Sequence, residues 1–304
     1  MGVLLLLVTT FIWGTAFLAQ KSASADLGPV AVTVFRNILG GVFLLSAIFV
    51  RSRMRGGAFR ATGGTRTGRS VLAGIACGAP LFAAMSAQQI GIQYTTPGIS
   101  AFLTTNYVLF VPVIGAVLMR RMPRLAVWAG AALAVAGTYF ICLGGGGAAG
   151  GFAGVGRGEL WTIACAFLFA VQMLVVERFA GRSDLLVMSA TQLLTCSVLG
   201  APLLFTEAES SRLAFAALKS AAIPLVYCGV FSSGIAYTLQ NVAQSRVSAP
   251  VAGVMLSLES VFGALAGWVV LGDRLAPVQI LGCCAVLAAA VIVQAVPAAK
   301  GENA

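Results

Sequence analysis

The chain has 304 residues, of which 59% are hydrophobic and only 9% are charged, and its net charge is +10. A soluble domain carries about 25% charged residues, so this chain could not cover its apolar surface in water. The composition excludes a soluble enzyme, a disordered protein and a nucleic-acid-binding domain, and it favours a helical membrane protein with several spans.

Ten apolar stretches follow one another along the chain, each close to the length of about 20 residues that a helix needs to cross a bilayer. The strands of a β-barrel would alternate polar and apolar residues, and these stretches do not. The sequence therefore predicts an all-α membrane protein with ten transmembrane helices. Their expected positions are residues 2–20, 28–50, 70–92, 97–118, 125–143, 158–177, 185–205, 221–241, 247–271 and 275–296.

Basic residues are divided unequally between alternate loops. If the N-terminus lies inside, the inner loops hold thirteen Lys and Arg residues and the outer loops hold five. Positively charged loops are retained in the cytoplasm, so we expect both termini there. The net charge then reflects membrane topology, and no basic face that would bind nucleic acid is expected.

The chain contains seven cysteines and no histidine. Every cysteine falls within a predicted span, and no two have the C-x-x-C spacing of a redox or zinc site, so we interpret them as small buried hydrophobes. The lack of histidine removes His-dependent catalytic triads and the zinc-protease motifs. We therefore expect no cofactor and no metal.

A glycine-rich stretch, GGGGAAGG at residues 144–151, lies at the middle of the chain. No Gly-Lys-Ser/Thr sequence follows it, so it does not predict a phosphate-binding loop. We expect a flexible linker over residues 144–157, between a first five-helix repeat at residues 1–143 and a second at residues 158–304.

Self-alignment of the two halves indicates an internal repeat. At a shift of 152 the fourth predicted span aligns with the ninth, so that Tyr107 matches Glu259. Near the start of each half the shift is 156, which matches Phe17 with Met173. Because five spans are an odd number, the second repeat enters the membrane inverted, a construction typical of secondary transporters. A duplicated channel or membrane enzyme remains an alternative at this point.

Two ionisable side chains, Arg36 and Glu259, lie clearly inside predicted spans. Each costs about 2.5–3.5 kcal/mol near a helix centre, so such residues normally face a cavity or a partner. Glu259 lies about twelve residues into its span, near the midplane. We expect Glu259 to hold a substrate ammonium or a coupling proton, and Arg36 to hold a substrate carboxylate. The alternative is that one or both residues tie helices together through hydrogen bonds to neighbouring polar groups.

A polar stripe runs along the eighth predicted span, with the spacing of one helix face. It consists of Ser233, Tyr237, Gln240 and Gln244. The matching positions in the third span include Met85 and Gln88 and are more apolar. A cavity with one polar and one apolar wall would suit an amphipathic solute such as an apolar amino acid, although methionine at this spacing is also typical of simple packing.

Three other spans supply the remaining candidate binding residues. They are Trp13 and Phe17 in the first span, Thr104 and Tyr107 in the fourth, and Gln172 in the sixth. Their aromatic rings could clamp a ring of the solute or gate a cavity, and packing between helices is the alternative. We also expect Pro112 to kink the fourth span.

Five short motifs occur in order along nearly the whole chain. They are Trp13-Gly14-Thr15, Leu27-Gly28-Pro29 leading to Arg36, Gln93-Tyr94-Thr95-Thr96-Pro97, Leu256-Ser257-Leu258-Glu259-Ser260 and Leu271-Gly272-Asp273-Arg274-Leu275. Together they resemble the drug/metabolite transporter superfamily, specifically its EamA-type ten-span permeases. That family usually has Pro where this chain has Ser260, and often Glu in place of Asp273. The resemblance implies a bacterial inner-membrane exporter of amino acids or similar metabolites, with a central cavity between inverted repeats.

We therefore expect a secondary transporter that exports amino acids, apolar or aromatic, or related small metabolites by alternating access. Protons could drive it, or the solute could run down its own gradient. A transporter for another metabolite class or for drug-like cations is the alternative. A channel would need rings of charge or of carbonyls, and an enzyme would need convergent catalytic groups, neither of which the sequence contains. The expected partners are the solute and the lipid bilayer, and the expected state is a monomer or a weak dimer.

Overall fold

The structure is a computed structural model, and it describes residues 1–54, 64–95, 97–119, 122–144, 156–205, 215–272 and 274–295. The residues of these ranges form helices and short connections and contain no strand. The greater part of the predicted glycine-rich linker, residues 145–155, lies outside the described residues.

Within the described part of the chain, ten helical spans are long and apolar enough to cross a membrane. This confirms the predicted fold class. The first six spans are α1 (Gly2–Asp26), α2 (Pro29–Met54), α3 (Gly64–Tyr94), α4 (Pro97–Thr105) with α5 (Tyr107–Met119), α6 (Leu125–Gly144) and α7 (Arg157–Ala180). The last four are α8 (Leu185–Gly200) with η1 (Ala201–Leu203), α11 (Ala222–Val226) with η3 (Tyr227–Ala236) and α12 (Tyr237–Gln244), α13 (Ala249–Leu256) with α14 (Glu259–Ala266) and η4 (Gly267–Leu271), and α15 (Pro277–Ala295).

The helix ends differ from the predicted ends mainly where a helix continues beyond its apolar part. For example, α1 continues to Asp26, past the predicted end at residue 20. Hydropathy marks the part of a helix that can lie in hydrocarbon, whereas backbone hydrogen bonding also extends through polar residues at the membrane surface. A short helix outside the spans, α10 (Phe215–Ser220), precedes the eighth span.

The fourth and ninth spans are both interrupted at equivalent positions. The fourth breaks at Asn106, between α4 and α5, and the ninth breaks at Ser257 and Leu258, between α13 and α14. Tight turns carry the chain across each break, because the amide of Asn106 donates to Leu103 O and the amide of Leu258 donates to Met255 O. Asn106 and Leu258 correspond at the shift of 152. The repeat is therefore visible in the helix interruptions themselves.

The position of the first break differs from the expected kink at Pro112. Pro112 lies inside the continuous helix α5, whereas Asn106 ends the preceding one. The side-chain amide of Asn106 donates to Phe102 O at 3.2 Å and to Leu103 O at 3.1 Å. An asparagine side chain can thus satisfy carbonyls that a helix break leaves open, which explains why this break falls at a polar residue.

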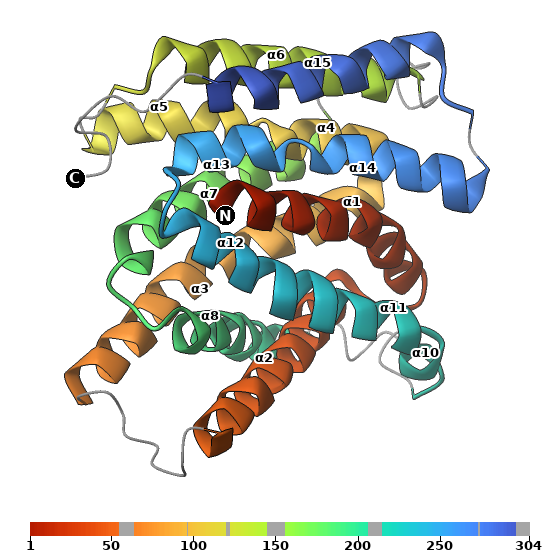
Figure 1. Ribbon diagram of the computed structural model, residues 1–304. Coiled ribbons are helices and arrows are strands. Elements are labelled where there is room, and N and C mark those ends of the chain that lie inside the picture. The colour runs from red at the N-terminus through yellow and green to blue at the C-terminus, as the bar shows by residue number, and fades with distance from the viewer. Residues whose placement is uncertain are drawn as a thin grey trace.

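The ten spans pack so that contacts in one half recur in the other. Helix α3, the third span, contacts α7, the sixth. The repeat equivalents of these two spans are the eighth and the first, and the eighth span contacts α1 in the same way. Likewise α3 contacts α8, and η3 of the eighth span contacts α2. Helices α6 and α15, which end the two halves, lie side by side along one edge of the bundle (Figure 1). The two repeats therefore interlock instead of forming separate bodies.

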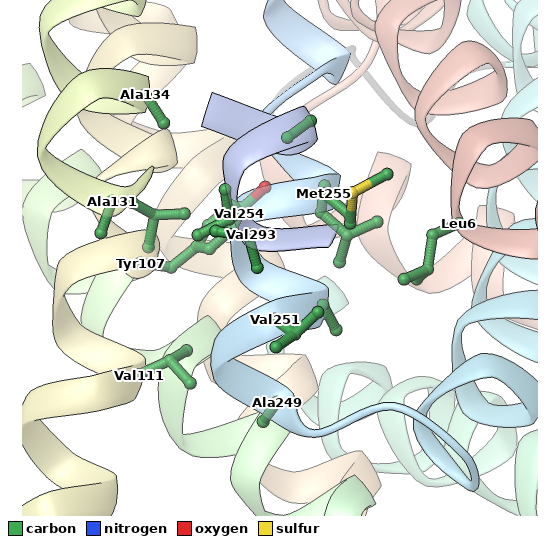
Figure 2. Packing of buried hydrophobic residues seen from close by; sticks show 14 of the residues in the cluster. Leu6, Tyr107, Val111, Ala131, Ala134, Ala249, Val251, Val254, Met255 and Val293 are labelled. Atoms are coloured by element: carbon green, nitrogen blue, oxygen red, sulfur yellow. The ribbon is translucent and has the colours of Figure 1, made fainter. Parts of the chain in front are cut away.

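The largest apolar cluster joins α5, α6, α7, α13 and α15, with Leu6 of α1 beside them. Figure 2 shows side chains of these helices meeting around Val254 and Val293. Glycines bring α6 and α15 especially close, because a Cβ atom added at Gly137 would lie 2.7 Å from Gly282 O. In a bilayer, where lipid tails are as apolar as leucine, such close packing stabilises helix pairs.

Candidate functional site: a cavity between the two repeats

A cavity lies where spans of both halves meet, and it contains about 480 Å³ of empty space when the part open to solvent is included. The first, second, third, fourth, sixth, eighth and ninth spans contribute to its wall. The residues of the first half are Trp13, Phe17, Gln20, Arg36, Gln88, Thr104 and Tyr107. Those of the second half are Phe169, Gln172, Met173, Ser232, Tyr237, Gln240, Leu256 and Glu259.

Ten of these lining residues form five pairs of repeat equivalents. The pairs are Trp13 with Phe169 and Phe17 with Met173 at the shift of 156, and Gln88 with Gln240, Thr104 with Leu256 and Tyr107 with Glu259 at the shift of 152. Equivalent residues lie close together only near the axis that relates two inverted repeats. The cavity therefore surrounds that axis, where inverted-repeat transporters bind their substrates.

Arg36 is a buried cation held by neutral oxygens. It is 3% exposed. Its Nε donates to Ser233 Oγ at 3.0 Å, its Nη1 to Gln20 Oε1 at 3.0 Å and its Nη2 to Ser232 Oγ at 2.8 Å. Among the described residues no carboxylate forms an ion pair with it. Nη1 and Nη2 each carry a second N–H, so the guanidinium keeps donors and an uncompensated positive charge at the cavity wall.

The two serines reach the same guanidinium because the eighth span is a π-helix over Tyr227–Ala236. Consecutive side chains of an α-helix diverge by about 100°, and the wider π-helical turn reduces this angle. The indole Nε1 of Trp13 donates to Ser232 O at 3.1 Å, so the same segment also fixes Trp13. The Trp13 ring packs against Tyr237, with ring centroids 4.8 Å apart.

Glu259 is a buried carboxylate, 5% exposed, at the first position of α14. Tyr107, the first residue of α5, donates its hydroxyl to Glu259 Oε1 at 3.2 Å. The helix dipole favours a negative charge at a helix N-terminus, so the start of α14 is a favourable position for the Glu259 carboxylate. Within the described ranges no Lys or Arg forms an ion pair with Glu259.

Two glutamines, Gln172 and Gln240, line another part of the wall, and a third, Gln244, supports Gln240. Gln240 donates from Nε2 to Gln244 Oε1 at 3.0 Å, and Gln244 donates from Nε2 to Met173 O at 3.0 Å. Among the described residues, Gln240 Oε1 has no hydrogen-bond partner, and neither polar atom of Gln172 has one, although both side chains are buried. Buried amides are normally satisfied, so these atoms mark a place where a solute can form hydrogen bonds.

Ten of the twelve candidate residues chosen from the sequence line this cavity, and Met85 and Ser233 do not. Met85 lies in an apolar cluster with Leu81, Leu193 and Tyr237, and its Sδ accepts a hydrogen bond from Asn37. Ser233 accepts a hydrogen bond from Arg36 Nε but does not line the cavity itself. The i, i+4 spacing of an α-helix does not hold through the π-helical segment, so Ser232, the preceding residue, lines the cavity.

Five lining residues were not among the twelve candidates. They are Gln20, Phe169, Met173, Ser232 and Leu256. The repeat contained the signal for three of them, because Phe169, Met173 and Leu256 are the equivalents of Trp13, Phe17 and Thr104. Gln20 follows Trp13 and Phe17 on the same helical face. Ser232 had no such signal, since nothing in the local sequence distinguishes a π-helical turn from an α-helical one.

Comparison with known proteins places the chain in a family. It matches the EamA-like transporter family over residues 1–143 and again over residues 156–294. It is 26% identical over 289 residues to an uncharacterized transporter of Archaeoglobus fulgidus, covering 95% of this chain and 84% of that protein. A WAT1-related chloroplastic protein of Arabidopsis thaliana is 24% identical over 289 residues, covering 93% of this chain and 67% of that protein.

Two further similarities are shorter or more distant. A threonine/homoserine exporter of Salmonella typhimurium is 35% identical over 60 residues, which is 20% of each protein. A solved crystal structure aligns with a TM-score of 0.76 and 21% identity, covering 97% of this chain and 96% of the other. The family expected from the motifs is thus confirmed, and the ten spans make this a multi-pass membrane protein. The chain belongs to the EamA-like transporter family.

Proposed function

We propose that this transporter exports amino acids, apolar or aromatic, or closely related metabolites across the bacterial inner membrane by alternating access. The observation that carries the proposal is the presence of two opposite buried charges, Arg36 and Glu259, on the wall of one cavity. Neither charge has an ionic partner among the described residues. A zwitterion supplies a partner for both.

The hydrogen bonds of the wall suit the two ends of an amino acid. The free N–H groups of Arg36 would receive the carboxylate, because a guanidinium binds a carboxylate with parallel hydrogen bonds. Glu259 would receive the ammonium. The aromatic rings of Trp13, Phe17 and Phe169 would then contact an apolar or aromatic side chain.

Glu259 also gives the transporter a means of coupling to protons. A buried carboxylate without a cation is costly, so the empty carrier would hold a proton there and exchange it for the substrate ammonium. Export would then bring a proton inward for each solute released outside. In the alternative without coupling, the solute runs down its own gradient and Glu259 binds only the ammonium.

The organisation of the chain supports movement of one repeat against the other. We propose residues 1–143 and 158–304 as the two moving repeats and residues 144–157 as the linker, with both termini in the cytoplasm. The family match in two separate segments, 1–143 and 156–294, supports this division. Both repeats of one chain contribute residues to the cavity wall, which supports transport by a monomer or a weakly associated dimer.

A drug-like cation is the alternative solute that Glu259 and the aromatic wall would favour. Arg36 argues against it, since a second cation at the same wall would repel a solute that carries no anion. The short similarity to a threonine/homoserine exporter also favours amino acids. A cationic dye that is carried while no amino acid is carried would reverse this preference.

Purified protein in proteoliposomes tests the proposal. Labelled amino acids are offered singly, with and without an imposed pH gradient, to wild type, Glu259→Gln and the matched control Glu159→Gln, whose carboxylate lies at the start of α7 and accepts from Thr95. Saturable counterflow in wild type and in the control, with loss of flux or of its pH response in Glu259→Gln, is expected. Two results would contradict the proposal: a flux that does not saturate with amino acid concentration, or no flux with any amino acid.

A further inference from the structure

Two glutamines at the cavity, Gln240 on its wall and Gln244 next to it, form a series of hydrogen bonds with a defined direction. The last acceptor in this series of hydrogen bonds is Met173 O, a backbone carbonyl that can only accept. Gln244 must therefore turn its NH₂ group toward Met173, which leaves its Oε1 toward Gln240. Gln240 must then present its own NH₂ group to Gln244.

This direction leaves Gln240 with its carbonyl oxygen as the free atom. Gln240 is 1% exposed and lines the cavity, and its Oε1 has no hydrogen-bond partner in the part of the chain that the structure describes. Gln244 is buried behind it and does not line the cavity. The orientation of the Gln240 amide is thus determined by a residue that the solute does not touch.

The acceptor lies far from the anion-binding end of the cavity. Arg36 is held by Ser232 and Ser233, and Gln240 follows Ser233 by seven residues, or about 10 Å along a helix. In an amino acid the ammonium and the carboxylate are attached to one carbon atom. With the carboxylate on Arg36, the group that reaches Gln240 therefore belongs to the side chain of the solute.

We propose that Gln244 is a positioning residue that holds Gln240 as a hydrogen-bond acceptor, so that the transporter selects solutes whose side chain ends in a donor. This inference rests on the proposed function, because it places the solute by its carboxylate on Arg36. Gln172 lines the same cavity and is buried, and neither of its polar atoms has a partner within the described ranges. It can complete the bonding of a hydroxyl because it offers both a donor and an acceptor.

The direction of these hydrogen bonds predicts that the transporter distinguishes two kinds of polar group at the end of the solute side chain. A hydroxyl can donate to Gln240, whereas a methoxy group of similar shape can only accept. A solute with hydrogen at this position leaves the amide oxygen without a partner. The expected order of apparent affinity is therefore hydroxyl first, then hydrogen, and methoxy last, with about a tenfold advantage for the hydroxyl.

The test uses three amino acids that share one aromatic side chain and differ only in its terminal group. They are tyrosine, phenylalanine and O-methyltyrosine, which end in a hydroxyl, a hydrogen and a methoxy group. Their KM and maximal counterflow rates are measured with wild type, Gln244→Met, Gln244→Glu and Gln240→Leu. The matched control is Gln279→Met, since Gln279 also donates to a backbone carbonyl, that of Ile141, and does not line the cavity.

Each variant has a distinct expected outcome in the ratio of KM values. Gln244→Met frees the Gln240 amide to turn, so the hydroxyl preference falls below about threefold and the methoxy solute improves relative to the others. Gln244→Glu keeps the preference, because a carboxyl group still accepts from Gln240. Gln240→Leu loses it, and Gln279→Met keeps it even if its melting temperature falls.

Failure of the inference differs from failure of the proposed function. If amino acids are carried without a hydroxyl preference, or the preference survives in Gln244→Met, the inference is wrong and the proposed function stands. If wild type carries none of the three solutes, the proposed substrate class is wrong, and the inference falls with it. A preference that disappears equally in Gln279→Met also overturns the inference, because the effect is then one of stability.

Discussion

Tyr107 donates a hydrogen bond to Glu259 across 3.2 Å, although the two residues are 152 positions apart and occupy equivalent places in the two repeats. Each is the first residue after the break in its span, at the start of α5 and of α14. The bond therefore crosses the axis that relates the repeats. Any movement of one repeat against the other must stretch, bend or break it.

Replacing Tyr107 with Phe should uncouple the two broken spans at this axis. The change removes one hydroxyl and leaves Glu259 buried without its donor, and leaving a buried polar group without its partner costs about 1–3 kcal/mol. We expect a lower melting temperature and a maximal counterflow rate reduced about tenfold. Tyr139→Phe is the control, because Tyr139 is partly exposed on α6 and packs its ring against Phe102 and Phe140. Equal effects in both variants would argue against a role for the Tyr107 bond.

The spans and most of the cavity wall could be predicted because lipid imposes a simple rule on sequence. A residue such as Arg36 or Glu259 inside an apolar run has few places to lie other than a cavity. The break at Asn106 could not be predicted in this way, since the hydropathy of the fourth span continues across it. Ser232 could not be predicted for a related reason, because α-helical periodicity points to Ser233 in a segment whose backbone is π-helical.

Arg36 provides a second prediction, on the recognition of the solute anion. Arg36→Lys keeps the positive charge but loses the planar guanidinium, which donates hydrogen bonds to Gln20, Ser232 and Ser233 at the same time. We expect KM for amino acids to rise about tenfold in Arg36→Lys, and flux to be lost in Arg36→Gln. Amino acid amides, which lack the carboxylate, should show no added loss in Arg36→Lys. The matched control is Arg53→Gln near the end of α2, where Arg53 packs over the Phe49 ring.

The ion pair between Arg51 and Asp184 provides a prediction on stability and pH outside the spans. Burial raises the pKa of Asp184, but the hydrogen bond from Arg51 at 2.8 Å and those from the backbone amides of Val187 and Leu186 outweigh it, so the net pKa is lowered. A lowered pKa in the folded state stabilises the protein above the ordinary pKa of the carboxyl. This stabilisation is lost as pH falls through the folded-state pKa.

Asp184→Asn isolates this charge, because asparagine can still cap the N-terminus of α8. The variant should melt at a lower temperature than wild type at pH 7, and the difference should shrink as the pH falls below about 4. The effect will be modest, since both side chains are about one third exposed. Arg51→Gln should reproduce it, and the double variant should add little. A difference that stays constant from pH 7 to pH 3 would show that the charge of Asp184 is not responsible.

Gly14 provides the last prediction, on the close approach of the first and ninth spans beside Glu259. A Cβ atom at Gly14 would lie 2.7 Å from Glu259 O and 2.7 Å from Phe262 Cβ, so neither backbone nor side chain has room for it. Gly14→Ala should push α1 away from α14, cost about 1–3 kcal/mol in stability and reduce counterflow through displacement of the Glu259 backbone. Gly181→Ala is the matched control, because no described atom beyond its chain neighbours lies within 4 Å of the added Cβ. Melting temperatures of both variants in detergent, with counterflow in proteoliposomes, test the contact, and an unchanged Gly14→Ala protein would mean that the two spans do not approach this closely.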